Sequence, residues 1–281
     1  MNSLTNCTVS IIGAGGKMGT RISNNLIGKE FTLNLCEKSD EKIKAMIDRN
    51  LTISSMEEVI PLSDFVILAV PDIYIHKISR EVSPLMKKDA VLITLDPAAA
   101  YADQLIVNDH CTSIVAHPCH PSIFLEKYTK EEYDDAFGGV AARQEVVVAV
   151  HKGDESKLES ALELISLMYT PVEKCHVITV EQMAILEPTL VETITCMVGT
   201  LLKESLEETK KLGVPEEAAK AMLYGHIQIA LSVALKGTNP FSDACMIAID
   251  LGKEAIIKSD WKKVFEKENL DYTISKMLKL S

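Results

Sequence analysis

The sequence predicts an α/β fold in which a doubly wound parallel sheet is followed by an all-helical C-terminal domain. Two observations carry this prediction. Short apolar segments of strand length alternate with amphipathic helical segments through the first half of the chain, which is the pattern of successive βαβ units. From about residue 180, apolar residues recur at helical spacing instead. We therefore predict one domain over residues 1–179 and a second over residues 180–281.

Seven strands and five helices are predicted for the first domain. The strands span residues 7–12, 31–36, 65–70, 90–95, 113–117, 145–151 and 172–178. The helices span residues 17–28, 40–49, about 55–60, 73–87 and about 154–169. The strand from Phe65 to Val70 is continuously apolar, as expected for a strand covered on both faces. It ends at Pro71 and Asp72, which should therefore line the ligand crevice at the carboxyl edge of the sheet.

The second domain is predicted to consist of helices. The first of them carries the apolar series Met183, Leu186, Leu190, Ile194, Met197 and Leu201. Further helices are predicted at about 215–236, 241–258 and 260–278, separated by segments that contain glycine and proline. Residues 228–235 and 245–251 are apolar almost all round, which indicates burial on every side. We therefore expect a homodimer formed through this domain.

A glycine-rich turn joins the first strand to the first helix. It consists of Gly13, Ala14, Gly15, Gly16, Lys17, Met18 and Gly19. Such a turn lets backbone N–H groups approach a dinucleotide pyrophosphate and directs the helix N-terminus at the anion, so it predicts a Rossmann-type domain. The spacing is G-x-x-G-x-x-G or G-x-G-x-x-x-G, and neither is the strict G-x-G-x-x-G. An ordinary strand-to-helix turn is the alternative interpretation.

Glu37 follows the second strand and lies 24 residues after Gly13. A carboxylate at that place accepts hydrogen bonds from the adenosine ribose and repels a 2′-phosphate, which favours NAD over NADP. A solvated surface glutamate is the alternative, and the neighbouring Lys38 leaves the preference open.

Composition narrows the function classes. The formal net charge of −11 argues against nucleic acid or an anionic membrane as a partner. The longest apolar runs are near six residues, well short of the roughly 20 of a membrane span, and no signal-peptide pattern opens the chain. Seven scattered cysteines without a C-x-x-C pair indicate reduced thiols, so we expect a cytoplasmic enzyme.

A second chemical motif runs from His117 through Pro118, Cys119 and His120 to Pro121, directly after a predicted strand. The prolines favour an extended conformation that turns both imidazoles to one side. Two imidazoles with a carboxylate and an open position suit zinc or a similar divalent metal. The alternative is that the histidines only hydrogen-bond loop backbone.

Glu187 is the candidate carboxylate ligand. On a helical wheel it shares an apolar face with Leu190, Val191, Ile194 and Val198, and a buried carboxylate needs a partner such as a metal. Pro188 complicates the wheel because it kinks or begins a helix. A salt-bridged glutamate beside a kink is the alternative.

Three further polar positions carry weaker expectations. Asp96 ends a predicted strand and should either touch cofactor or substrate or cap a helix. Arg143 should either bind a substrate carboxylate or be a sheet-edge charge. The acidic pair Asp134 and Asp135 is interpreted as part of a solvated loop face.

The residues quoted above carry a family resemblance. The first half and the helical second half resemble the 6-phosphogluconate and 3-hydroxyisobutyrate dehydrogenase superfamily, whose enzymes have a catalytic lysine early in the long interdomain helix. This chain departs from them, since no lysine lies between Lys174 and Lys203, and Glu187 occupies roughly that region. With the motif Gly-Ala-Gly-Gly-Lys-Met-Gly and the motif His-Pro-Cys-His-Pro-Ser-Ile-Phe, the chain most resembles the D-apionate oxidoisomerase group.

The resemblance implies NAD-dependent oxidation of a branched hydroxy acid, coupled to rearrangement of its carbon skeleton. In our hypothesis His117 and Glu187 hold a divalent metal that polarises the substrate hydroxyl, and His120 is a further ligand or the general base. A plain hydroxy-acid dehydrogenase, with His120 as base and no metal, is one alternative. A non-catalytic NAD-binding regulatory protein is another.

Overall fold

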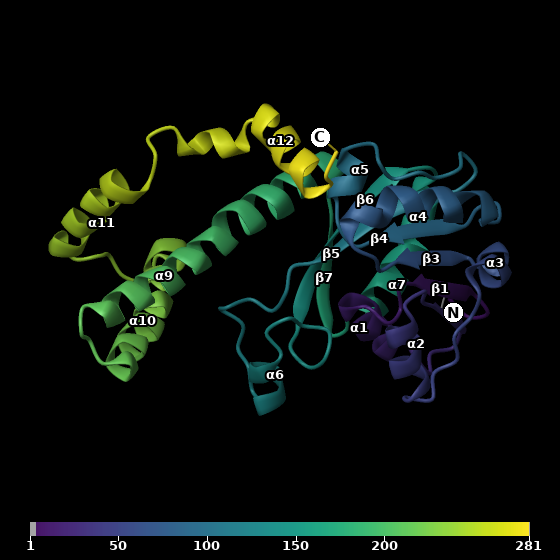
Figure 1. Cartoon of the computed structure of the whole chain (residues 1–281), viewed down its shortest axis with the longest axis horizontal. Coiled ribbons are helices and arrows are strands. Elements are labelled where there is room, and N and C mark those ends of the chain that lie inside the picture. Colours follow the sequence, from purple (N-terminus) through teal and green to yellow (C-terminus); the bar gives the residue numbers. More distant parts are fainter. Residues whose placement is uncertain (1–3, 281) are drawn as a thin grey trace. The chain divides into compact units, whose positions relative to one another are not determined.

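The seven predicted strands form one sheet, in the order β2-β1-β3-β4-β5-β6-β7, in the computed structural model, which describes residues 4–280 (Figure 1). The strands are β1 (Thr8–Ile12), β2 (Thr32–Cys36), β3 (Phe65–Leu68), β4 (Val91–Thr94), β5 (Thr112–Pro118), β6 (Gln144–Lys152) and β7 (Val172–Val177). All seven strand predictions are confirmed, and each end falls within two residues of its expected position. The order reverses on either side of β1, so a ligand crevice is expected at the carboxyl ends of β1 and β3.

The sheet is parallel from β2 to β5 and changes direction at β6. Strand β6 runs antiparallel to β5, and β7 runs parallel to β6. The connection between β5 and β6 contains only the short helix α6 (Lys130–Asp134), whereas a parallel neighbour needs a crossover, usually a helix. The chain therefore returns beside β5 in the opposite direction and keeps residues 119–143 close to the carboxyl end of that strand.

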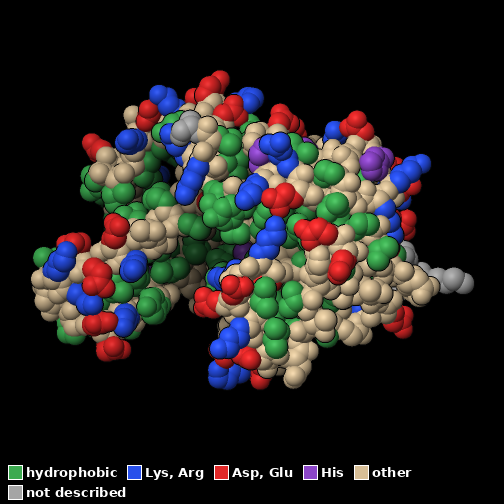
Figure 2. All heavy atoms as spheres, turned by 45° about the vertical axis from the view of Figure 1, so that its right-hand side comes forward, with side chains coloured by type: hydrophobic (Ala, Val, Ile, Leu, Met, Phe, Trp, Pro, Cys, Tyr) green, Lys and Arg blue, Asp and Glu red, His purple; other side chains and the backbone are tan. Residues whose placement is uncertain are grey.

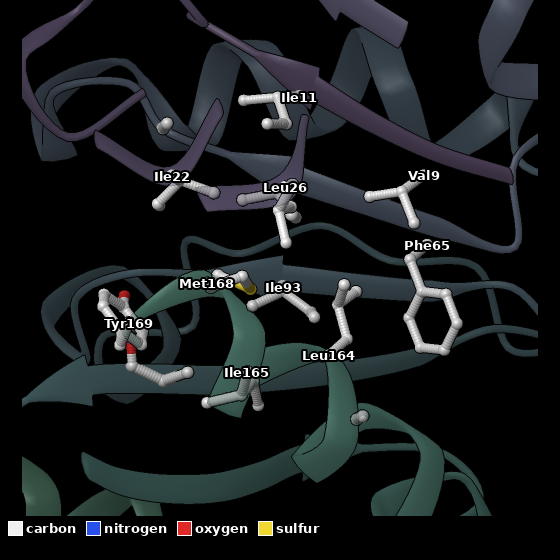
Figure 3. Close-up of a cluster of buried hydrophobic side chains, with 14 of the residues drawn as sticks. Val9, Ile11, Ile22, Leu26, Phe65, Ile93, Leu164, Ile165, Met168 and Tyr169 are labelled. Carbon is white, nitrogen blue, oxygen red and sulfur yellow. The ribbon is translucent and has the colours of Figure 1, made fainter. Parts of the chain in front are cut away.

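Helices cover both faces of the sheet. The helices α1 (Lys17–Leu26) and α7 (Leu158–Met168) pack on one face, in a buried cluster that also includes Ile67 of β3. Figure 3 shows Ile22 and Leu164 in this cluster. The helices on the other face include α4 (Ile75–Val82), α5 (Ala98–Tyr101) and α8 (Val180–Ala184). Leu68 packs on that face, so successive residues of β3 point to opposite layers, as the continuous apolar run predicts.

The helices α2 (Asp40–Ile47) and α3 (Met56–Val59) complete the elements before β3. From Val180 to Lys211 the chain is one continuous helix, composed of α8, a π-helix over Ile185–Cys196 and α9 (Met197–Lys211). It is followed by α10 (Glu216–Leu231) with a π-turn at Ser232–Lys236, then α11 (Asp243–Ile256) and α12 (Lys267–Met277). The helical character of the chain after residue 180 is thus confirmed.

The structure divides into two compact units. One consists of Met1–Leu186 together with Asp271–Ser281, and the other of Glu187–Leu270. The end of α12 returns to the first unit, where the Tyr101 hydroxyl donates a 2.7 Å hydrogen bond to Asp271. The domain boundary expected after residue 179 stays a prediction.

The helical unit exposes an unusual amount of apolar surface. Of residues 187–270, all of which the structure describes, only five are buried. Hydrophobic side chains reach the surface of the molecule among the charged ones (Figure 2). Two helices, Val180–Lys211 and Glu216–Lys236, are long and apolar enough to cross a membrane by length and composition alone. In the most apolar 18 residues of each helix, 17% and 6% are buried, respectively.

Candidate functional site

The glycine-rich turn after β1 has the backbone that close packing requires. Gly13 has a φ of +83°, and a Cβ there would lie 2.6 Å from the carbonyl oxygen of Ala69. A Cβ on Gly19 would overlap the carbonyl oxygen of Gly13, so α1 approaches the turn only because residue 19 is glycine. Gly16 is the N-cap and Lys17 the first residue of α1, and the N–H groups of this helix end are a ready anion site.

One cavity of about 430 Å³ contains most of the residues predicted for the cofactor. Its lining includes the predicted residues Gly13, Gly16, Lys17, Met18, Glu37, Pro71, Asp72 and His117. Ala14 is buried beneath the turn, while Gly15 contacts Glu37. The structure therefore brings the turn, the end of β3 and the first histidine together at one edge of the sheet, where these strands end.

Glu37 is held by three backbone N–H groups. Its Oε2 accepts a 3.0 Å hydrogen bond from Gly15, and its Oε1 accepts bonds from Lys38 and Ser39 at 2.9 and 3.1 Å. The carboxylate thus fixes the glycine turn and keeps acceptor capacity on Oε2. The side chain is half-buried and bonded to the turn, and its contact with a ribose stays a prediction.

A second cavity of about 260 Å³ adjoins Glu37 and Gly13. Its lining includes Cys36, Ser54, Ser55, Met56 and Glu57. Burial raises the pKa of the Cys36 thiol to about 11, so the thiol is neutral and contributes apolar surface. This mixture of apolar and hydroxyl groups beside the Glu37 carboxylate suits a purine, and no sequence motif marks the two serines.

Two carboxylates follow the ends of β3 and β4. Burial, assisted by the nearby charge of Asp96, raises the pKa of Asp72 to about 7. Asp96 Oδ1 accepts a 2.8 Å hydrogen bond from the N–H of Ala98 at the start of α5. Asp96 therefore bonds the first turn of α5 and lines the 430 Å³ cavity as well, and its contact with cofactor or substrate stays a prediction.

His117 is fixed in one tautomer by the end of β4. Its Nδ1 lies 2.9 Å from the carbonyl oxygen of Leu95, and because a carbonyl only accepts, Nδ1 carries the hydrogen. Burial lowers the pKa of His117 to about 4; the Leu95 bond opposes that shift and His120 adds to it. The ring is therefore neutral at pH 7 and offers the lone pair of Nε2, the state in which histidine binds a metal.

His120 lies beside His117 with a different set of contacts. Their ring centroids are 6.3 Å apart and the ring planes are inclined by 83°. His120 has a φ of +61°, and its Nδ1 lies 2.8 Å from the carbonyl oxygen of Phe137. Both histidines thus make the hydrogen bond to loop backbone that the alternative interpretation expects. Both bonds use Nδ1, so the Nε2 atom of each ring can still bind a metal or accept a proton.

Glu187 is buried, with 6% of its surface exposed, but the helical wheel predicts this burial for the wrong reason. Leu190 and Val191, expected on its face, are 43% and 42% exposed. The segment is a π-helix with a wider turn than the α-helix assumed by the wheel, and Pro188 lies inside it without an N–H to donate. Met183, one turn earlier in the same helix, is fully buried against the sheet and anchors this helix end.

Three of these side chains converge. One ligand atom from each of Asp96, His117 and Glu187 lies within 4.8 Å of the other two. Two carboxylates and a neutral imidazole around one point are a donor set for a divalent cation, and the Leu95 hydrogen bond supplies the outer-shell orientation that such a histidine needs. The sequence predicts His117 and Glu187 for this role; Asp96 is the third member, and His120 is outside the set.

Two other expectations change. Asp135 is predicted on a solvated face, yet it is only 7% exposed, and its Oδ2 accepts the N–H groups of Val140, Ala141 and Ala142 at 2.9–3.1 Å. These bonds outweigh the burial and lower the pKa of its carboxyl. Arg143 makes a 2.8 Å ion pair with Glu173, so its guanidinium already has a carboxylate partner.

Comparison with known proteins agrees with these features. The chain matches the C-terminal domain of phosphogluconate dehydrogenase (decarboxylating) over residues 125–278 and the NAD-binding domain of D-isomer specific 2-hydroxyacid dehydrogenases over residues 1–99. It is 55% identical to a D-apionate oxidoisomerase of Pectobacterium atrosepticum, over 97% of this chain and 96% of that protein. It is 44% identical to a D-apionate oxidoisomerase of Blautia hydrogenotrophica, over 96% of both chains.

A solved structure is also similar over nearly the whole chain. It is the crystal structure of a semialdehyde dehydrogenase NAD-binding protein from Cupriavidus necator in complex with calcium and NAD. The sequence identity is 37% and the TM-score is 0.94, over 97% of this chain and 100% of that one.

Proposed function

This chain belongs to the D-apionate oxidoisomerase family and is an NAD-dependent oxidoreductase acting on a CH–OH group, and we propose that its substrate is D-apionate. The observation that carries the proposal is the convergence of Asp96, His117 and Glu187 in a chain that shares 55% of its residues with an enzyme of that name. Oxidation coupled to rearrangement needs both a hydride acceptor and a group that holds neighbouring oxygens of a polyhydroxy acid.

The cofactor half of the site follows from the glycine turn. NAD, when bound, accepts the hydride from the carbon that is oxidised. Gly13 and Gly16 admit the pyrophosphate to the N-terminus of α1, and Lys17 adds a positive charge at the same helix end. Glu37 faces the ribose, and Pro71 ends β3 beside the same cavity.

The residues present fit a divalent cation. Asp96, His117 and Glu187 would hold it, and a bound cation polarises a substrate hydroxyl and lowers its pKa. The burial of Glu187 excludes water from one side of the proposed cation position. The His117 ring is neutral and therefore does not repel a cation. Two carboxylates favour an oxygen-preferring cation such as calcium, magnesium or manganese more than the zinc that a pair of imidazoles suggests.

His120 is the candidate general base. Phe137 fixes the hydrogen on Nδ1, so Nε2 is the nitrogen that takes a proton from the substrate hydroxyl as the C–H bond gives up its hydride. In this balance the hydroxyl proton goes to His120, the hydride goes to the nicotinamide, and the carbon becomes a ketone. Asp72, whose pKa is raised to about 7, is an additional proton-exchanging group; it lines the 430 Å³ cavity with His117, whereas His120 lines a neighbouring loop cavity of about 390 Å³ with Arg143.

The test is turnover of D-apionate with NAD, followed by NADH absorbance and by NMR of the product's carbon skeleton. We expect NADH formation, a rearranged product and loss of turnover with a chelator that is restored by adding back one of calcium, magnesium, manganese or zinc. His117→Ala and Glu187→Gln should abolish turnover, while Lys88→Gln, a substitution outside the cavity lining, should not.

Each outcome separates one alternative. A product with its skeleton intact, formed without a metal, would support a plain hydroxy-acid dehydrogenase. NADH binding without turnover of any sugar acid would support a non-catalytic regulatory protein.

A homodimer is part of the proposal. Seventeen large hydrophobic side chains of Glu187–Leu270 are at least 39% exposed, and they include Met197, Met222, Ile229, Leu235, Ile247 and Leu251. At roughly 60–100 Å² each they offer on the order of 1,000 Å², above the roughly 800 Å² per partner of a standard interface. The residues expected to be buried on every side therefore need a second chain to bury them.

A membrane fits these helices less well than a second copy. The uncharged stretch of α10 and its π-turn, residues 221–235, is 15 residues long, against the roughly 20 that a bilayer core requires. Light scattering at micromolar concentration should give twice the chain mass, and Leu235→Glu with Ile247→Glu should give a monomer. Leu62→Glu, at an equally exposed leucine of the other unit, is the control. A monomeric wild type, or flotation with lipid vesicles, would contradict the dimer.

A further inference from the structure

Residues 135–142, after α6, form a loop that is tightly held although it contains two adjacent glycines. The buried carboxylate of Asp135 accepts three consecutive backbone N–H groups, from Val140 to Ala142. Gly138 and Gly139 have φ values of +73° and +78°, and a Cβ on Gly138 would lie 2.5 Å from Gln144 Oε1. The loop therefore has one defined backbone path, set by a single carboxylate and two glycines.

One side of this loop is attached to the helix that begins at the cofactor turn. Arg21 of α1 donates a short hydrogen bond to the carbonyl of Gly138, and its Nη1 lies 3.7 Å from Asp135 Oδ1. Asn25, one turn later on the same helix, donates a 3.1 Å hydrogen bond to the carbonyl of Gly139. Lys17, at the start of α1, lies with its Nζ 3.9 Å from the ring centre of Phe137.

The other side of the loop holds His120. The carbonyl of Phe137 accepts the Nδ1 hydrogen at 2.8 Å, and the Phe137 ring meets the imidazole edge-on, with centroids 5.8 Å apart and planes at 89°. His120 has the left-handed φ of +61°, which a non-glycine residue keeps only where its surroundings determine it. Phe137 thus sets the tautomer and the plane of the ring from a backbone that Arg21 and Asp135 hold in place.

We infer that Arg21 and Asp135 are positioning residues for His120, and that they tie this histidine to the cofactor helix α1. The inference rests on the proposed role of His120 as general base. Because the pyrophosphate turn and the loop share one helix, the distance from the cofactor to His120 is set through α1. Neither Arg21 nor Asp135 lines the cavities of the cofactor site, so both act through their contacts alone.

The first test is a mutant cycle between Arg21 and His120, assayed with D-apionate and NAD. Arg21→Gln should lower kcat by about 10- to 100-fold, within the range of general acid–base catalysis, while KM and the Kd for NADH change less than threefold. In the His120→Ala background the same substitution should cost less than twofold. Arg21→Lys should restore part of kcat, and Arg49→Gln, at an exposed arginine after α2 that bonds the Asn24 side chain of α1, is the matched control.

The second test needs no turnover. NMR of protein labelled with ¹⁵N-histidine should show His120 as a single Nδ1–H tautomer in the wild type and in Arg49→Gln. In Arg21→Gln the signal should move toward a mixture of tautomers. If Arg21→Gln does not fold, Asp135→Asn carries the same two measurements, because it keeps the shape of the side chain and removes its charge.

An equal loss of kcat in both backgrounds, or an unchanged His120 tautomer in Arg21→Gln, would overturn the inference. Full activity of His120→Ala would instead refute the proposed base, and the tautomer measurement would then decide the positioning role by itself.

Discussion

Glu37→Gln is expected to narrow the preference for NAD over NADP, because it should raise the affinity for NADPH and lower the affinity for NADH. The substitution keeps the length of the side chain and one carbonyl acceptor but removes the charge. In the structure that charge faces the cavity while three backbone N–H groups, from Gly15, Lys38 and Ser39, hold the carboxylate in place. The amide side chain would retain at least one of these bonds, so the glycine turn should keep its form.

The magnitude follows from the charges and the hydrogen bonds. Two unit charges about 5 Å apart interact by roughly 1–3 kcal/mol at effective dielectric constants between 80 and 20. Removing the carboxylate should therefore improve affinity for NADPH, with its 2′-phosphate, by about 5- to 150-fold. Affinity for NADH should fall by about fivefold, since a charged acceptor for the ribose hydroxyl is replaced by a neutral one worth about 1 kcal/mol less.

Calorimetric titration with NADH and NADPH measures both changes. Glu41→Gln is the matched control because it makes the same charge change at an exposed position of α2. The reasoning is refuted if the ratio of the two affinities in Glu37→Gln equals that in Glu41→Gln. A loss of affinity for both cofactors by the same factor would show that Glu37 acts only on the turn.

Three further expectations follow. Gly19→Ala should weaken NADH binding at least tenfold and cost about 1–3 kcal/mol of stability, because the added methyl overlaps the Gly13 carbonyl; calorimetry and thermal unfolding check this against Gly199→Ala, where nothing lies within 4 Å. With calcium as the probe of the proposed cation site, Asp96→Asn should weaken binding at least tenfold and leave NADH affinity unchanged, and equal calcium affinity in titrations would contradict the proposed ligand role of Asp96. Burial lowers the pKa of His151, so the folded state binds fewer protons than the unfolded state and stability is lost as pH falls below about 6.5. His151→Asn should therefore flatten the loss of unfolding free energy between pH 7 and 5, and an unchanged slope in denaturant titrations would refute this.

Strand and helix positions in the first unit were predictable because each depends on local pattern. The apolar run of β3 needs burial on both faces, and it receives α1 and α7 on one side and α4 on the other. The positive φ of Gly13 and the close contact of Gly19 with the Gly13 carbonyl both belong to one strand–turn–helix unit, so these two glycines were identifiable from sequence. The direction of β6 was harder to predict, because the strand pattern alone indicates a parallel sheet. Strand β6 runs antiparallel to β5 because the connection between them lacks a crossover helix.

The polar contacts of buried carboxylates were the main features that could not be predicted from the sequence. Asp135 lies in an acidic run that is typical of a solvated face, and its partners are backbone groups five to seven residues later. Nothing in the residue types distinguishes it from Asp134, which is exposed and makes an i,i+4 ion pair with Lys130. Asp96 was ambiguous for a related reason, since a helix cap and a ligand are compatible uses of one carboxylate with two oxygens.

Glu187 shows how a correct candidate can come from an incorrect local geometry. The wheel assumes 3.6 residues per turn, but in the π-helix Thr193 Oγ1 bonds the carbonyl of Pro188, five residues earlier. The wider turn buries Glu187, Pro188 and Thr189 together and leaves Leu190 outside, the opposite of the predicted stripe. Proline has no N–H for the α-helical ladder, and the wider turn accommodates it without ending the helix. The same π-helix carries the Glu187 carboxylate whose ligand atom lies within 4.8 Å of those of Asp96 and His117, so a correct candidate residue came from a wrong description of its helix.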